Sequence, residues 1–168
     1  MILLYTGNGK GKTTAAIGTA LRALANNKKV TLVQFLKPGN SSEIKFLKKI
    51  PNLTLKSFGK KSLTDPRKLT QKDFILIKKA LRFVKKSIEE NPFLLILDEI
   101  IIALKFKLLS ETQVVEIINK CKEERIHLIL TGSGTTKRLI READLVSEVR
   151  NIKHPFELGI KAVKGIDY

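Results

Sequence analysis

A glycine- and lysine-rich segment near the start of the chain constrains the fold more than any other feature. It reads Thr6-Gly-Asn-Gly-Lys-Gly-Lys-Thr-Thr14 and stands between a buried-strand pattern at Ile2–Thr6 and an alanine-rich helix pattern at residues 13–26. Glycines let backbone N–H groups turn inward around phosphate oxygens, and the N-terminus of the next helix adds its dipole. Lys12 supplies a positive charge to phosphate, and the Thr13 hydroxyl can bind Mg²⁺. The spacing Gly-x-x-x-Gly-Lys-Thr, one residue shorter than usual, therefore predicts nucleotide binding.

Short apolar runs alternate with helix patterns along the rest of the chain. Runs that are apolar on both faces, as in buried parallel strands, occur at residues 30–36, 93–97 and His127–Thr131, with a weaker candidate at Leu53–Phe58. Helical periodicity covers residues 70–90 and 111–124. This alternation predicts one α/β domain over residues 1–168: a P-loop NTPase-like, mainly parallel sheet flanked by helices in a three-layer sandwich.

Polar or glycine-rich segments follow three of the four strong strands. They are residues 6–14, the pair Asp98 and Glu99, and residues 131–134. Ligands of parallel sheets bind beyond the carboxyl ends of the strands, so this convergence predicts a site there. Asp98 and Glu99 are expected near a metal ion on the phosphates. One carboxylate would bind the metal directly and the other through water, and the sequence leaves both assignments open.

The helix at 70–90 has an apolar stripe and a basic remainder. Thr70 and Asp73 at its start resemble a capping box. The stripe is expected to be buried; its members are Phe74, Ile77, Leu81, Val84 and Ile88. The basic residues are expected to form a solvated face; they are Lys78, Lys79, Arg82, Lys85 and Lys86.

The net charge of the chain also bears on its possible partners. The 168 residues carry 32 Lys plus Arg against 16 Asp plus Glu, a formal charge of +16, and residues 1–91 hold 20 of the basic and 5 of the acidic side chains. Such a basic half could face nucleic acid, an acidic protein or a polyphosphate. Solvated lysines account for much of this basic charge, because 25 of the basic residues are Lys and few aromatic side chains are present for base stacking.

Composition also excludes several classes. One cysteine rules out a disulfide framework and a Cys-rich zinc site. No apolar stretch approaches the roughly 20 residues of a membrane span. The first strand reaches the loop by Gly7, which leaves no room for a signal peptide, so we expect a cytoplasmic soluble domain.

The chain offers no evident protein nucleophile. His127 opens a buried strand and is expected to be structural, Cys121 lies at core spacing, and His154 in a C-terminal turn could reach the site. The protein would then contribute positioning and electrostatics to a reactant that brings its own reactivity. A P-loop kinase or ATPase giving ADP is the alternative enzyme, and an ATP-dependent nucleic-acid-binding module is the alternative outside enzymes.

The segment from Tyr5 to Arg22 resembles the shortened phosphate loop of the corrinoid (cob(I)alamin) adenosyltransferases of the single-domain P-loop type. Three further stretches are similar: residues 33–37 (VQFLK), 97–100 (LDEI) and 143–150 (ADLVSEVR). The ending at residues 154–168, HPFELGIKAVKGIDY, resembles the C-terminal signature of the family.

The resemblance implies transfer of the 5′-deoxyadenosyl group of ATP to Co(I) of a reduced corrinoid, with release of triphosphate, in adenosylcobalamin biosynthesis or salvage. It implies catalytic roles for Lys12, Thr13 and Glu99, and Mg²⁺ on Thr13, Glu99 and Asp98. The nucleotide would be held by the loop and the helix after it, namely by Gly7, Asn8, Gly9, Lys10, Gly11, Lys12, Thr13, Thr14 and Arg22. A homodimer and an acidic flavoprotein reductant, using the basic surface, are further expectations.

The sequence departs from the family pattern in three places. Where the family has an aromatic pair that packs beneath the corrin, this chain has residues 58–64 and no tryptophan, so Phe58, Leu63 or another side chain would substitute, or the corrinoid preference would differ. Where the family has Thr-Gly-Arg-Gly, this chain has Thr131-Gly-Ser-Gly134. Ser133 therefore stands in place of an arginine that could make a charged contact. Members often carry a segment before the first strand, and without that lid the nucleotide would be more exposed.

Overall fold

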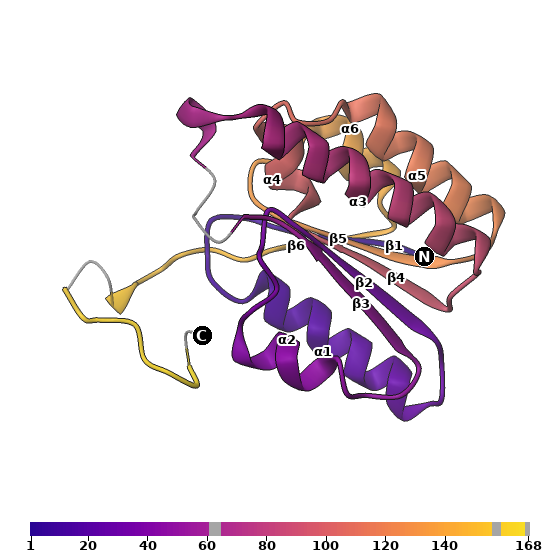
Figure 1. The fold of residues 1–168 in the computed structure, drawn as a ribbon, viewed down its shortest axis with the longest axis horizontal. Coiled ribbons are helices and arrows are strands. Elements are labelled where there is room, and N and C mark those ends of the chain that lie inside the picture. The colour runs from indigo at the N-terminus through magenta and orange to yellow at the C-terminus, as the bar shows by residue number, and fades with distance from the viewer. Residues whose placement is uncertain (61–64, 156–158, 167–168) are drawn as a thin grey trace.

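Six parallel strands form one sheet in the order β3-β2-β4-β5-β1-β6 (Figure 1). The computed structural model describes residues 1–60, 65–155 and 159–166. The strands are β1 (Ile2–Thr6), β2 (Val30–Phe35), β3 (Leu53–Phe58), β4 (Leu94–Asp98), β5 (His127–Thr131) and β6 (Leu145–Glu148). All pairings are parallel, which confirms the α/β three-layer class predicted from the sequence.

Helices cover both faces of the sheet. Figure 1 shows α1 (Lys12–Ala25) and α2 (Ser42–Leu47) on one face. The other face carries α3 (Gln71–Glu89), α4 (Ile100–Lys105), α5 (Glu111–Glu123) and α6 (Lys137–Glu142), and a short 3₁₀ turn at Pro66–Lys68 precedes α3. Each face has its own apolar core, because β2 and β4 are buried on both sides. Their continuous apolar runs are what a doubly covered parallel strand requires.

Capping residues fix where helices α3 and α5 begin. Thr70 and Asp73 form the capping box predicted for α3, and Ser110 and Gln113 form one at the start of α5. In each box the side chains satisfy backbone N–H groups that have no partner within the helix. The start of α3 therefore follows from local sequence chemistry.

The buried stripe of α3 differs from the predicted one at its first position. Phe74 is 42% exposed, whereas Asp73 beside it is only 2% exposed. The capping box turns Asp73 inward, and this rotates Phe74 toward solvent. The next turns agree with the prediction: Ile77, Val84 and Ile88 are buried, and the five basic residues of the helix are exposed.

Four short elements lie outside the sequence prediction. They are α2, α4, α6 and β6, none longer than 6 residues. β6 pairs only with β1, and all four of its residues are exposed, so its sequence lacks the apolar run that marked the other strands. The predicted strands and long helices are confirmed to within about two residues at each end.

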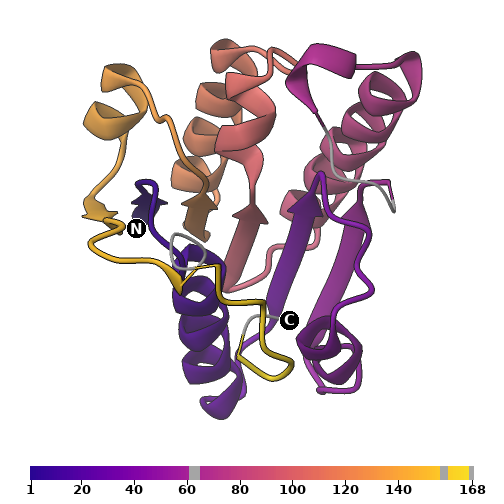
Figure 2. The same cartoon turned by 90° about the vertical axis from the view of Figure 1, so that its left-hand side faces the viewer.

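The segment after β6 crosses the carboxyl ends of the strands. In Figure 2, which looks onto that edge, the yellow segment passes in front of α1. The N–H of Gly9 donates to the carbonyl of Val149 at 2.8 Å, and the N–H of Asn151 donates to Asn8 Oδ1 at 3.0 Å. The chain therefore returns to the glycine-rich loop near its end. In the described part of the chain, no helix is long and apolar enough to cross a membrane.

Candidate nucleotide and metal site

The glycine-rich loop joins β1 to α1 at the carboxyl edge of the sheet. Gly7 and Gly11 have φ angles of +99° and +115°, a region that side chains rarely adopt. Gly11 is the N-cap of α1, and no side chain among the described residues caps this helix. The first N–H groups of α1 are therefore open toward a ligand, which is the arrangement that binds phosphate.

Close packing explains why two loop positions need glycine. A Cβ on Gly7 would lie 2.3 Å from the carbonyl oxygen of Val149, and one on Gly9 would lie 2.7 Å from the carbonyl carbon of Arg150. The backbone after β6 thus supports the loop from outside. A larger residue at either position would push the loop away from this support.

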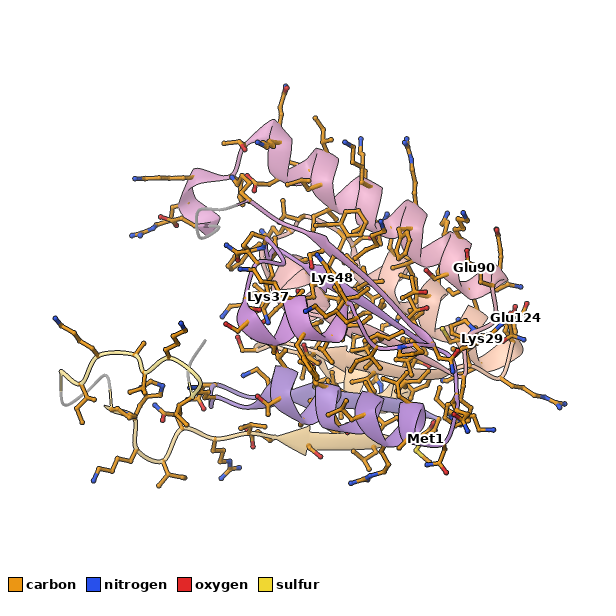
Figure 3. The ribbon with its side chains drawn as sticks, turned by 60° about the horizontal axis from the view of Figure 1, so that its bottom comes forward. Met1, Lys29, Lys37, Lys48, Glu90 and Glu124 are labelled. Atoms are coloured by element: carbon orange, nitrogen blue, oxygen red, sulfur yellow. The ribbon has the colours of Figure 1, made fainter. Side chains whose placement is uncertain are left out.

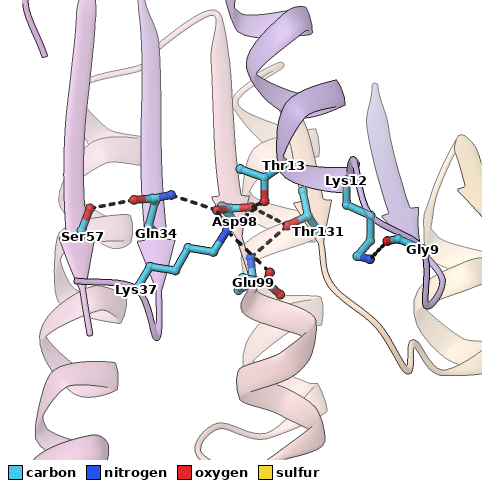
Figure 4. A network of polar contacts seen from close by, with 9 residues as sticks. All are labelled: Gly9, Lys12, Thr13, Gln34, Lys37, Ser57, Asp98, Glu99 and Thr131. Atoms are coloured by element: carbon cyan, nitrogen blue, oxygen red, sulfur yellow. Dashed lines mark hydrogen bonds and ion pairs between the residues drawn. The ribbon is translucent and has the colours of Figure 1, made fainter. Parts of the chain in front are cut away.

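Lys12 at the start of α1 folds back over the loop. Its Nζ donates to the carbonyl oxygen of Gly9 at 2.6 Å (Figure 4). The ammonium group therefore already lies over the turn of the glycine-rich loop, where a flexible lysine side chain could reach a phosphate.

Asp98, at the end of β4, is the centre of a buried polar network (Figure 4). Its side chain has no exposed area. Oδ1 accepts from the hydroxyls of Thr13 and Thr131, each at 2.8 Å. Oδ2 accepts from Gln34 Nε2 at 3.0 Å and from Lys37 Nζ at 2.8 Å. Both oxygens thus have two donors each, so this carboxylate is held in place as a buried anion.

Two further hydrogen bonds extend the network to both sides. Ser57 Oγ donates to Gln34 Oε1 at 2.9 Å, which orients the amide of Gln34 toward Asp98. The N–H of Glu99 donates to Thr131 Oγ1 at 2.9 Å. Glu99 itself has a φ of +64°, and this left-handed turn ends β4 and starts α4. The network therefore joins β3, β2, β4, β5 and α1.

Glu99 is the more accessible of the two carboxylates. Its side chain is 24% exposed and forms an ion pair with Lys37, with Oε1 and Nζ 3.6 Å apart. Burial raises the pKa of Glu99, and the Asp98 charge raises it further, against the lowering effect of Lys37 and Lys12. A cation placed beside this carboxylate would stabilise its ionised form.

Lys37, just after β2, contacts three members of the site. Its Nζ lies 2.9 Å from Thr13 Oγ1, 2.8 Å from Asp98 Oδ2 and 3.6 Å from Glu99 Oε1. Burial lowers the pKa of Lys37, but the charges and hydrogen bonds of Asp98 and Glu99 outweigh it and raise the pKa overall. Lys37 therefore stays a cation at neutral pH.

The oxygen atoms around Lys37 Nζ are of the type that Mg²⁺ prefers. A threonine hydroxyl and one or two carboxylates, completed by substrate phosphates and water, are the usual ligands of this ion. Among the described residues, no group of three or more His, Cys, Asp and Glu side chains could hold a metal. The donors on Thr13, Glu99 and Asp98 thus fit a Mg²⁺ ion that arrives with a phosphate.

The structure brings some of the predicted site residues together and leaves others apart. Thr13, Asp98 and Glu99 share one network, with Lys12 on the adjoining loop. Arg22 lies in the last turn of α1 and is exposed, roughly 15 Å along the helix from Lys12 at 1.5 Å per residue. The loop side chains Asn8, Lys10 and Thr14 are exposed.

The remaining predicted positions lie around this centre. Lys10 and His154 line a pocket of about 380 Å³ beside the loop. The Phe58 ring packs against Phe83 with 5.9 Å between centroids. Leu63 lies outside the described residues, as do residues 156–158 and 167–168 of the C-terminal signature. Cys121 is buried, as predicted, and burial raises the pKa of its thiol to about 12.

Four members of the network were not predicted from the sequence. Three are Gln34, Lys37 and Ser57, and the fourth is Thr131, whose hydrogen bond to Asp98 was not foreseen. A polar Gln34 inside the apolar run of β2, followed three residues later by Lys37, is the signal that could have found two of them. Their partners lie 61 and 64 residues away along the chain, and only the strand order makes them neighbours.

Comparison with known proteins agrees with this geometry. The model of the family described as ATP:corrinoid adenosyltransferase BtuR/CobO/CobP matches residues 1–168. The chain belongs to this family. A corrinoid adenosyltransferase of Escherichia coli (strain K12) is 32% identical over 169 residues, covering 100% of this chain and 85% of the relative. Corrinoid adenosyltransferases of Sinorhizobium sp and Pseudomonas aeruginosa are 33% and 32% identical, covering 100% of this chain and 80% and 83% of their own lengths.

Family membership confirms the resemblance drawn from the sequence. It supports a transferase that uses ATP and a corrinoid, and no comparison favours the kinase alternative. ATP:corrinoid adenosyltransferase chemistry also suits a site that holds phosphate-binding and metal-binding groups without an evident protein nucleophile.

Proposed function

We propose that the loop and the Asp98 network hold the triphosphate of ATP as the leaving group while Co(I) of a bound corrinoid attacks C5′ of the ribose. The cobalt–carbon bond forms as the C5′–O bond breaks, and the electron pair of that bond leaves with the triphosphate. Cobalt supplies the electron pair of the new bond and becomes formally Co(III). The observation that carries this assignment is the buried network that links Thr13 of the loop to Asp98 and Lys37.

Residues of the loop would offset the charge that develops on the leaving triphosphate. The N–H groups of Gly11 and the first turn of α1 would donate to phosphate oxygens, and Lys12 would move from the Gly9 carbonyl to a phosphate. Asn8, Lys10 and Thr14 would bind at the rim of the loop. Arg22 would contribute only if the nucleotide or corrinoid extends along α1.

Bound Mg²⁺ would add positive charge next to the same phosphate oxygens. We propose Thr13 and Glu99 as its direct protein ligands. Asp98 would act through Thr13, because all four acceptor positions of Asp98 are taken by hydrogen bonds. The Thr13 hydroxyl donates its proton to Asp98, which leaves its lone pairs toward the cation.

Further proposals concern the setting of the enzyme. A homodimer acting in the cytoplasm, with an acidic flavoprotein as the source of electrons, would suit a chain with a formal charge of +16. The exposed basic residues of α3 support an acidic partner by charge complementarity. Analytical ultracentrifugation of the protein would test the dimer.

The deciding experiment combines ATP and Mg²⁺ with chemically reduced corrinoid. We expect the visible spectrum of an adenosylated corrinoid and equimolar triphosphate. Formation of ADP without a cobalt–carbon bond would instead support the kinase or ATPase alternative. Lys12→Ala serves as the control, because it should lose product formation while its circular dichroism spectrum stays that of the wild type.

A further inference from the structure

A lysine ammonium occupies the position at which the donors of the metal site converge. Lys37 Nζ contacts Thr13 Oγ1 and Asp98 Oδ2 within 2.9 Å and lies 3.6 Å from Glu99 Oε1. Figure 4 shows the side chain entering this cluster from the segment after β2, opposite the phosphate loop. No ligand is needed to satisfy these oxygens, since the lysine already does so.

The hydrogen-bond directions make this overlap specific. The Thr13 hydroxyl donates its single proton to Asp98, so it can only accept a hydrogen bond from Lys37. The lysine N–H thus occupies one of the two lone pairs of Thr13 Oγ1, the atom that a metal ion would use. A metal ion on the same oxygen would lie next to the lysine ammonium, so lysine and metal compete for this position.

From this competition we infer that Lys37 is an internal counter-cation that blocks Mg²⁺ binding to the free protein and leaves when metal and nucleotide arrive together. The inference rests on the metal site proposed above. A bare Mg²⁺ ion would have to displace a charge-paired lysine, whereas Mg²⁺ with ATP brings phosphate oxygens as additional ligands and an anion for the released ammonium. The side chain of Lys37 is 33% exposed and can swing outward.

The chain contains a matched lysine pair that serves as a control. Lys60 Nζ lies 2.7 Å from Oδ2 of Asp73, an aspartate that is only 2% exposed. Removing Lys60 also leaves a buried aspartate without its cation. Asp73, however, belongs to the capping box of α3 and has no phosphate loop beside it.

The test measures thermal unfolding of wild type, Lys37→Met and Lys60→Met without ligand, with Mg²⁺ alone, and with Mg²⁺ plus ATP. Wild type and Lys60→Met should respond to Mg²⁺ only when ATP is present. Lys37→Met should respond to Mg²⁺ alone, with a Tm increase of about 3 °C at a concentration roughly tenfold above its dissociation constant. Lys37→Arg retains the charge and should behave as the wild type.

Three results would overturn the inference. The first is a Mg²⁺-only response of Lys37→Met no larger than that of wild type, and the second is an equal gain in Lys60→Met. The third needs no variant and holds even if Lys37→Met fails to fold: electron paramagnetic resonance showing that wild type binds Mn²⁺ alone as tightly as with ATP. Adenosylation assays are independent of these readouts, so a chain that makes no adenosylcorrinoid but shows the Lys37 effect would refute only the proposed function.

Discussion

Two aspartates are buried in the part of the chain that the structure describes, each paired with a lysine, and the two pairs are built in different ways. Asp73 accepts from the N–H and hydroxyl of Thr70, three residues away, and from Lys60. Asp98 instead accepts from four side chains on other elements, at 33 to 85 residues' separation. A buried ion pair therefore does not by itself mark a functional site. What distinguishes Asp98 is that distant elements meet around it beside a phosphate loop.

The largest contrast is expected between the two Asp→Asn variants. Asp98→Asn should reduce adenosyl transfer about 100-fold, because misplacement of Thr13 disturbs the geometry of the leaving group. It should also lower the free energy of unfolding by roughly 3–5 kcal/mol, as for one broken buried pair. Asp73→Asn should keep activity within about twofold of wild type. It should lower the free energy of unfolding by only about 1–2 kcal/mol, as for a lost helix cap. Steady-state kinetics and urea unfolding would measure both, and equal activity losses would remove the distinction.

Glu99→Gln sharpens the comparison within the Asp98 network. Losing a direct metal ligand should raise the Mg²⁺ concentration for half-maximal activity about tenfold. Glu124→Gln is the control, since Figure 3 places Glu124 at the end of the molecule away from Lys37. An unchanged metal titration for Glu99→Gln would reject it as a ligand.

Ser57→Ala tests how far the network extends. Gln34 is 1% exposed, and its Oε1 would lose the hydroxyl that now donates to it at 2.9 Å. Leaving that buried oxygen unsatisfied should cost about 1–3 kcal/mol of stability. Activity should fall only a fewfold, because Asp98 keeps its other donors. Thr54→Ala, at an exposed position of the same strand, should change neither stability nor activity. If Ser57→Ala behaved like Thr54→Ala, Ser57 would lie outside the site.

The smallest expected effect concerns acid. Burial raises the pKa of Asp73, but the hydrogen bonds from Lys60 and Thr70 outweigh it and hold this pKa below its usual range. The folded state thus favours the carboxylate, so this contribution to stability is present above about pH 4 and is lost as the pH falls through the lowered value. The stability gap between wild type and Asp73→Asn should therefore shrink between neutral pH and pH 3. A gap that is constant with pH would contradict this.

Local chemistry accounts for the parts of the fold that the sequence predicted. The capping box at Thr70, the apolar runs of β2 and β4 and the glycines of the loop act over a few residues, and each could be recognised before the structure. Residues 100–105 are as apolar as a strand continuing from β4. Only the left-handed turn at Glu99 makes them the separate helix α4.

In the candidate site, too, the residues that could be predicted are those that belong to local sequence patterns. Lys12, Thr13, Asp98 and Glu99 belong to short motifs with a known chemical logic. Gln34, Ser57 and Lys37 have no such motif, and they reach Asp98 because β3, β2 and β4 are neighbours in the sheet. Strand order depends on the packing of the whole chain, which local patterns do not contain.

The support of the loop by Val149 and Arg150 also sets an order of events during synthesis. The backbone that Gly7 and Gly9 pack against is made about 140 residues after these glycines. Contacts of such long sequence separation form late, because closing the intervening loop costs entropy before it is repaid. A chain interrupted before Val149 would contain the entire phosphate-loop motif without the carbonyl that holds Gly9. Support of the loop would thus report that the chain has been made past β6 and has closed back on the glycine-rich loop.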